Sequence, residues 1–214
     1  MKKEKITKFS DFVYYYKWHV VVLLIVAALL AYFVRDCTNK VENDVSLAFM
    51  LSNQTEYNTA DEITADLTGA GLIPDLDGDG INQLYTNMMV SLIDDMSETG
   101  TAVNYQISIE FAAGESMLFI IDEDLIEVYE QHGAFADISE KAKSYSIAEE
   151  DLYIAEDGTP IGISLKGNEY LESKGIVTDT LYACFRNTFD RELTKEEQAK
   201  KEVAEKIFDY IIMK

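Results

Sequence analysis

The residues best suited to chemistry lie in a short acidic stretch with the sequence PDLDGDGIN. Asp75, Asp77 and Asp79 stand at alternate positions, and Gly80 permits the sharp turn that brings carboxylates together. Hard oxygen ligands that converge on one point are what Ca²⁺ requires. The sequence therefore predicts a calcium site made by Asp75, Asp77, Asp79 and Ile81.

The spacing of these carboxylates resembles the opening of calcium loops of the EF-hand and dockerin types. Position twelve of such a loop is Thr86 here, where an EF-hand has a bidentate Glu, and no paired EF-hand helices are evident. A shortened loop could use a more distant carboxylate, with Asp94, Asp95 and Glu98 as candidate donors. The other interpretation is a solvated Asp/Gly turn that leads into a strand.

The sequence offers no catalytic motif. His19 and His132 are the two histidines, and neither is placed to pair with a serine or cysteine nucleophile. There is no GxSxG, HExxH, Walker or GxGxxG pattern, and carboxylate pairs arise by chance in so acidic a chain. We therefore expect a protein that is not an enzyme.

The charge distribution excludes a nucleic-acid partner. The chain carries a net charge of −21, and residues 41–140 contain 21 Asp and Glu but not one Lys or Arg. Such a surface repels phosphate backbones and favours cations. Acidity that only keeps the protein dissolved is the plainer explanation for most of these carboxylates.

The start of the chain predicts a membrane anchor. An apolar run, VVVLLIVAALLAYFV, follows a lysine-rich segment, and the positive-inside bias would keep that segment in the cytoplasm. This indicates a single-pass protein of the cell membrane with its C-terminal domain outside the cytoplasm. The predicted parts are a basic tail (1–17), a transmembrane signal anchor (18–35), a juxtamembrane linker (36–44) and an extracytoplasmic domain (45–214).

A cleaved signal peptide is the competing interpretation of this segment, although Leu29 does not suit a small-x-small site that ends at Ala31. A lipoprotein anchor at Cys37 is disfavoured, because Val34, Arg35 and Asp36 precede it where small apolar residues are needed. The anchor is the interpretation that we carry forward.

The remainder reads as alternating strands and helices. Residues 45–51 place apolar side chains on both faces, as in a strand covered on both sides, which suggests the interior of a parallel sheet. A capping box at Thr59 and Glu62 begins a helix, and residues 84–93 look extended. Residues 101–113 fit either a strand or a helix.

The second half continues this alternation. A strand at residues 116–121 stops at Asp122 and a helix follows, while Asp157 with Gly158 marks a tight reversal. Residues 181–185 form another strand, in which Cys184 is expected to be a free core thiol. A capping box at Thr194 and Glu197 opens the last helix. We predict a single three-layer α/β domain with a mostly parallel sheet.

The passage AAGESMLFIIDEDLIEVYEQHGAFADISEKA resembles the first lobe of type 2 extracellular solute-binding proteins. There, a helix ending in small residues and glycine feeds a strand that stops at an acidic residue, followed by a helix and a passage like residues 133–139. Residues 160–176 resemble the segment in which that family's chain crosses back between lobes. The resemblance implies that residues 101–113 are helical.

The resemblance also implies a ligand crevice at the carboxyl ends of the strands. Matched by position, its rim is formed by Ser52, Asn53, Gln54, Asp122 and Glu123. The family's second lobe is missing, so burial and affinity should be low. The plainer interpretation is that these residues cap strand ends and loops.

Two functions stay open. The first is a membrane-tethered module that binds a small molecule, a peptide or a neighbouring membrane or envelope protein, with calcium as a possible cofactor. The second is a structural or assembly subunit of an envelope complex with no small-molecule ligand. Tethering would favour either, because a partner in the same membrane is met at high effective concentration.

Overall fold

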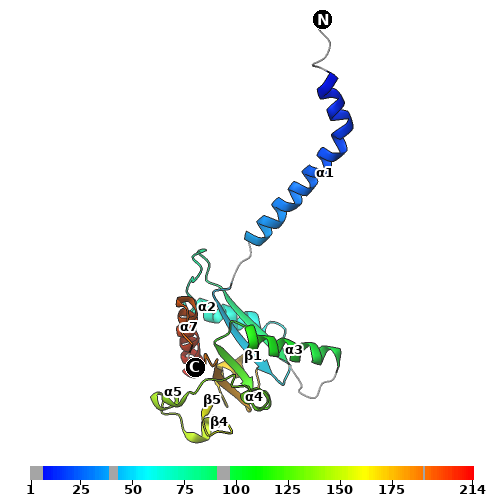
Figure 1. Ribbon diagram of the computed structural model, residues 1–214. Coiled ribbons are helices and arrows are strands. Elements are labelled where there is room, and N and C mark those ends of the chain that lie inside the picture. Colours follow the sequence, from blue (N-terminus) through cyan, green and yellow to red (C-terminus); the bar gives the residue numbers. More distant parts are fainter. Residues whose placement is uncertain (1–6, 39–42, 91–96, 190) are drawn as a thin grey trace. The chain divides into compact units, whose positions relative to one another are not determined.

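The computed structural model (Figure 1) describes four stretches of the chain: 7–38, 43–90, 97–189 and 191–214. The chain divides into two compact units, Met1–Glu42 and Asn43–Lys214. The first unit holds one helix, α1 (Thr7–Thr38), and the second holds the remaining helices and the sheet.

The prediction of a transmembrane helix at residues 18–35 is wrong. Within the described part of the chain, no helix combines the length and the apolar character that crossing a membrane demands. The apolar run inside α1, residues 20–34, is shorter than the roughly 20 residues that span a bilayer core.

Within the residues that the structure describes, six strands form one sheet in the order β2-β1-β3-β6-β5-β4. Their bounds are β1 (Val45–Leu51), β2 (Leu84–Val90), β3 (Leu118–Asp122), β4 (Leu152–Ile154), β5 (Pro160–Ser164) and β6 (Leu181–Phe185). β1 lies between β2 and β3 and pairs with β2 along its whole length, from Val45 opposite Leu84 to Leu51 opposite Val90.

The sheet is mixed, which corrects the prediction of a mostly parallel sheet. β1 is parallel to β2 and β3, because helical crossovers of sufficient length join these strands. The pairs β3–β6, β6–β5 and β5–β4 are antiparallel. A tight turn at Asp157 and Gly158 joins β4 to β5, and a short turn of this kind allows only antiparallel pairing.

Helices cover both faces of the sheet (Figure 1). The helices of the domain are α2 (Thr59–Gly69), α3 (Glu98–Ala113), α4 (Glu123–Glu130), α5 (Ser139–Ser144), α6 (Glu169–Ser173) and α7 (Lys195–Ile212). α2, α6 and α7 contribute to one buried cluster, and α3 and α4 to the other. The helix expected at residues 101–113 is confirmed as part of α3.

Strand periodicity separates the two cores. In β1, Leu47 and Phe49 face the cluster that contains α7, whereas Ala48 and Met50 face the cluster that contains α3. All four are fully buried, because successive side chains of a strand point to opposite faces and both faces are covered. Cys184 is a free, buried thiol, as expected.

The two predicted capping boxes have different outcomes. At α7 the box is present: the Thr194 hydroxyl accepts from the Glu197 N–H, and the Glu197 carboxylate accepts from the Thr194 N–H. At α2 the N-cap residue is Asn58, and the Thr59 hydroxyl donates instead to the Lys174 carbonyl. A tertiary contact therefore replaces the local cap.

Arg186, directly after β6, ties α3 to the sheet. Its guanidinium donates to the carbonyls of Ser116, Phe111 and Glu110 at 2.7, 2.8 and 2.6 Å. It lies 3.7 Å from the Glu110 carboxylate and stacks over the Phe119 ring, 5.1 Å from its centroid. The side chain thus satisfies the Phe111 carbonyl, which the end of α3 leaves without an intrahelical partner, and adds a second donor to the Glu110 carbonyl, which already accepts the Gly114 N–H.

Candidate metal centre

Asp44 is the buried anchor of the site. It directly precedes β1, and only 3% of its surface is exposed. Its Oδ1 accepts the backbone N–H groups of Leu76 (2.5 Å) and Asp77 (3.2 Å), and its Oδ2 accepts that of Gln83 (2.8 Å). One carboxylate therefore holds the middle and the last residue of the loop that connects α2 to β2.

The loop folds around its own carboxylates. Asp75 accepts the N–H groups of Gly78 and Gly80 at 2.7 and 2.9 Å. Both glycines have positive φ, near 81° and 85°, a conformation that glycine adopts without steric cost. Asp77 accepts the Asp79 N–H at 2.9 Å. The PDLDGDGIN sequence thus curls back on itself and holds its carboxylates close together.

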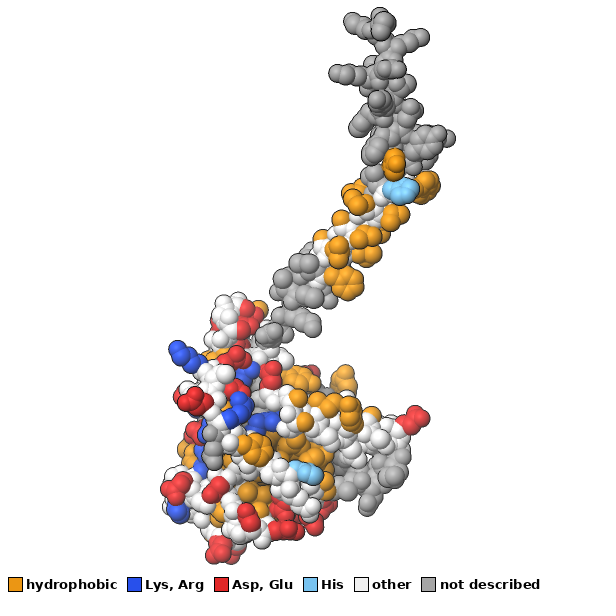
Figure 2. Space-filling view, in the orientation of Figure 1, with side chains coloured by type: hydrophobic (Ala, Val, Ile, Leu, Met, Phe, Trp, Pro, Cys, Tyr) orange, Lys and Arg blue, Asp and Glu red, His pale blue; other side chains and the backbone are white. Residues whose placement is uncertain are grey.

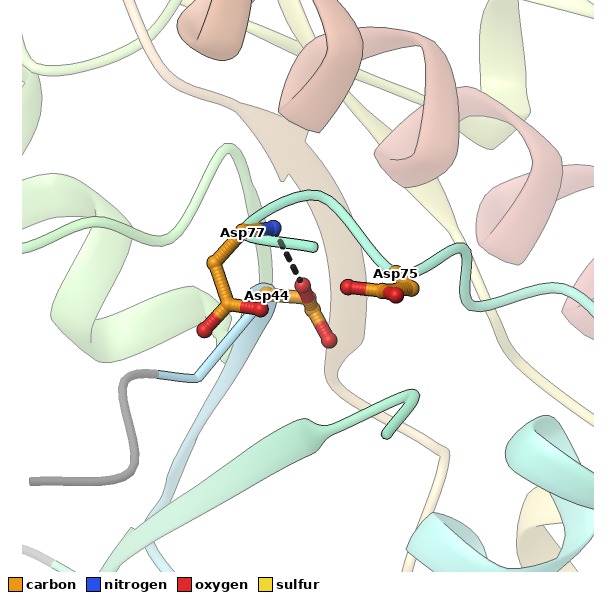
Figure 3. Close-up of side chains that lie close together, drawn as sticks. All are labelled: Asp44, Asp75 and Asp77. Carbon is orange, nitrogen blue, oxygen red and sulfur yellow. Dashed lines mark hydrogen bonds between the residues drawn. The ribbon is translucent and has the colours of Figure 1, made fainter. Parts of the chain in front are cut away.

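Three carboxylates converge as a result (Figure 3). Asp44, Asp75 and Asp77 each offer an oxygen, and these oxygens all lie within 4.8 Å of one another. Two oxygens that share one Ca²⁺ at 2.3–2.6 Å lie at most about 5 Å apart, so this spacing suits a single ion. Carboxylate oxygens that accept an N–H retain lone pairs for a metal. The triad could hold a metal ion.

The pKa values of the two loop carboxylates shift in opposite directions. Desolvation acts to raise the pKa of Asp75, but hydrogen bonds from Gly78 and Gly80 outweigh it and lower that pKa. For Asp77, the hydrogen bond from the Asp79 N–H acts to lower the pKa. Desolvation and the charges of Asp79 and Asp44 outweigh that bond and raise the pKa of Asp77. Positive charge at this point would relieve the repulsion.

The structure brings together only part of the predicted metal set. Asp75 and Asp77 belong to the triad, whereas the cluster among the described residues does not include Asp79, whose carboxylate accepts the Ile81 N–H at 2.7 Å. The Ile81 side chain is exposed to solvent. Of the more distant candidate donors, Glu98 begins α3 outside the triad, and Asp94 and Asp95 lie outside the described residues.

Asp44 is the member that the sequence motif does not contain. It stands 31 positions before Asp75, separated from it by β1 and α2. The Val45 N–H donates to the Gln83 carbonyl, so the starts of β1 and β2 lie side by side. The sequence did contain a signal for Asp44. It precedes one strand, the acidic loop precedes another, and parallel pairing of the two strands would bring them together.

The predicted ligand crevice lies at the opposite ends of β1 and β3. These strands are parallel neighbours, with helices leaving to opposite faces, so their carboxyl ends form a topological switch point. The Ser52 N–H donates to Asp122 Oδ2 at 2.6 Å, and the Thr180 hydroxyl donates to Oδ1 at 2.5 Å. Asp122 is buried, and its carboxylate links Ser52, which follows β1, to Thr180, which precedes β6.

The other predicted rim residues are open to solvent. Asn53 and Gln54 are exposed after β1, and so is the Glu123 side chain. The Glu123 N–H donates to the Thr180 carbonyl at 2.9 Å. Ser52, Asp122 and Thr180 thus make a closed internal contact, while three residues stay available at the rim.

Known proteins add no family to this description. Neither the models of known protein families nor the curated protein sequences give a match to this chain.

Proposed function

We propose that this chain is a calcium-binding interaction module and not an enzyme. The observation that carries the proposal is the convergence of Asp44, Asp75 and Asp77 around one point, with the first carboxylate buried and the other two on a glycine-shaped loop. A cation held there would fix the loop to the starts of β1 and β2. The module would then present an ordered acidic surface to its partner.

Calcium fits the triad better than magnesium. Ca²⁺ accepts six to eight oxygens in a flexible geometry, and an irregular loop with three carboxylates, carbonyls and water can supply them. Mg²⁺ demands near-ideal octahedral geometry at shorter distances. Three carboxylates without a bidentate Glu suit the weak sites of extracellular proteins, with Kd values of about 10⁻⁴–10⁻³ M. The proposal therefore includes an extracytoplasmic location for the domain.

The first prediction concerns metal and stability. In a thermal-shift experiment on the full chain, we expect 10 mM CaCl₂ to raise Tm by roughly 3–10 °C relative to EDTA. This follows from about 1.4–2.7 kcal/mol of linkage at 10–100 times Kd, and from about 2–4 °C per kcal/mol for a chain of this size. MgCl₂ at the same concentration should give less than half of the shift.

Asp77→Ala removes one carboxylate of the triad, and Asp157→Ala is its matched control. Asp157 also lies in an exposed Asp-Gly turn, and its carboxylate accepts the Thr159 N–H at 2.9 Å. It stands outside the triad among the described residues. Asp77→Ala should abolish the calcium shift, and Asp157→Ala should retain it. No shift in the wild-type chain at saturating calcium would contradict the proposal.

A second candidate function is an assembly subunit without a small-molecule ligand. The contact of Asp122 with Ser52 and Thr180 favours it, because this buried carboxylate at the switch point is already engaged within the protein. A thermal-shift screen with sugars and short peptides separates the two. Stabilisation by a small ligand that Asn53→Ala or Gln54→Ala removes would reject the assembly role.

A further inference from the structure

The outer edge of β2 is a long, unpaired strand edge. β2 ends the sheet, and within the described part of the chain no strand pairs with its outer side. Its seven residues run beside β1 without a register shift. The other sheet edge is protected, because β4 has only three residues and its pairing with β5 is irregular at Tyr153 and Ile154.

The hydrogen-bonding direction of β2 can be assigned by residue. The Val45 N–H donates to the Gln83 carbonyl at 3.2 Å. Backbone groups of alternate residues point to opposite sides of a strand, so the odd-numbered residues of β2 face β1. The N–H and C=O groups that point outward belong to Leu84, Thr86, Met88 and Val90.

This edge lacks the features that usually prevent pairing. The sequence LYTNMMV contains no charged residue and no proline. Tyr85 is 48% exposed, and α3, which contacts β2, exposes Tyr105 (68%) and Ile109 (46%). Figure 2 shows hydrophobic side chains gathered along α3. Free backbone groups thus lie beside an apolar surface, the combination that an added strand requires.

Charge decides which strand could be added. Asp75, Asp77 and Asp79 precede β2, and the Gln83 N–H binds the buried Asp44 carboxylate, so the amino-terminal end of the edge is acidic. A second copy paired in parallel would align the two acidic loops. In either direction, a second copy adds repulsion between chains that each carry a charge of −21.

We infer that the outer edge of β2 docks an extended segment of a partner protein, with apolar residues in its middle and Lys or Arg at the end that lies beside the acidic loop. The segment adds a seventh strand: its backbone pairs with the even-numbered residues of β2, and its apolar side chains cover Tyr85 and α3. Its basic end lies near the acidic loop. This inference rests on the proposed interaction function and names the partner chemistry.

The test uses a fluorescent synthetic peptide of alternating valine and threonine with two lysines at each end, titrated with the full chain in fluorescence anisotropy. We expect saturable binding that weakens at least tenfold in 0.5 M salt, because screening acts on the charged ends. A peptide with glutamate ends should bind at least tenfold more weakly. So should a lysine-ended peptide whose alternate backbone amides are N-methylated. Equal binding of either control peptide would overturn the inference.

Two variants locate the binding on β2. Met88→Pro removes an outward N–H, which an edge strand tolerates, and should weaken binding at least tenfold. Since Met88 packs partly against the core, Tyr85→Lys and Tyr85→Glu form a second, surface pair. The lysine should weaken binding of the basic peptide and the glutamate should not. Unchanged binding in both Met88→Pro and Tyr85→Lys would overturn the inference.

Sedimentation of the chain without peptide tests whether a second copy of the chain occupies the β2 edge. A dimer that Tyr85→Lys strengthens and Met88→Pro abolishes would replace the basic segment by a second copy and overturn the inference. Repeating the titration in calcium and in EDTA separates the two proposals. If the peptide does not bind but calcium still raises Tm, only the docking site is contradicted. If the peptide binds but calcium does not raise Tm, only the metal function is contradicted.

Discussion

Asp44→Ala is expected to lower the free energy of unfolding by about 3 kcal/mol in the absence of metal. Its buried carboxylate accepts the N–H groups of Leu76, Asp77 and Gln83, and alanine would leave all three without this partner. Each lost hydrogen bond to a buried charged group costs on the order of 1 kcal/mol or more. Urea denaturation in EDTA, followed by circular dichroism, measures the loss.

Asp44→Asn is the matched variant. Its side-chain oxygen can still accept from Leu76 and Asp77, but its amide would face the Gln83 N–H, donor against donor. We expect an intermediate loss, roughly half that of alanine. If the free energy of unfolding of Asp44→Ala lies within about 0.5 kcal/mol of the wild-type value, Asp44 does not hold the loop.

Arg186→Met should cost about 3–5 kcal/mol, which is the largest effect that we expect from a single substitution. The change removes three hydrogen bonds to carbonyls and leaves Glu110, whose side chain is 12% exposed, without its cationic partner. Burial acts to lower the pKa of Arg186, and the Glu110 carboxylate acts against that shift. Arg186→Lys should lose about half as much, because an ammonium cannot reproduce the planar fork.

The partner substitution tests the pairing within this contact. Glu110→Gln removes the charge that Arg186→Met leaves unpaired, so the double variant should be more stable than the sum of the single losses predicts, by at least about 1 kcal/mol. Urea denaturation of the four chains supplies the cycle. Simple additivity would show that the Glu110 charge plays no part in holding Arg186.

Local sequence patterns predicted much of the fold. The burial of both faces of β1, the end of β3 at Asp122 and the capping box of Thr194 all follow from residues within a few positions of one another. The direction of β6 does not, because its place beside β3 depends on pairing between residues about 60 positions apart. A short apolar strand carries no signal for whether it runs parallel or antiparallel to its neighbour. For this reason the prediction of a mostly parallel sheet failed at β6.

The candidate site divides in the same way. Asp75 and Asp77 were accessible to prediction because a metal loop is a local motif, and Asp44 was not because strand pairing brings it to the loop. Thr59 shows the same limit at α2, where a carbonyl from a distant residue, Lys174, replaces the predicted cap. Tertiary partners of this kind leave no trace in a local pattern.

Asp77→Asn tests the metal centre most directly, because its effect should change sign with calcium. The folded state raises the pKa of Asp77, so this group's stabilising contribution is present below its ordinary pKa and is lost as pH rises through the raised value. Above that value Asp77 is an unfavourable charge. Asparagine is neutral and its oxygen can still accept the Asp79 N–H.

The measurement is Tm of the wild type and Asp77→Asn at pH 7, each in EDTA and in 10 mM CaCl₂. In EDTA the variant should melt at or above the wild type, since a repelled carboxylate has been removed. In calcium the order should reverse, because the wild type binds the ion with three carboxylates and the variant with two. The same order of Tm in both conditions would contradict a calcium site at Asp44, Asp75 and Asp77.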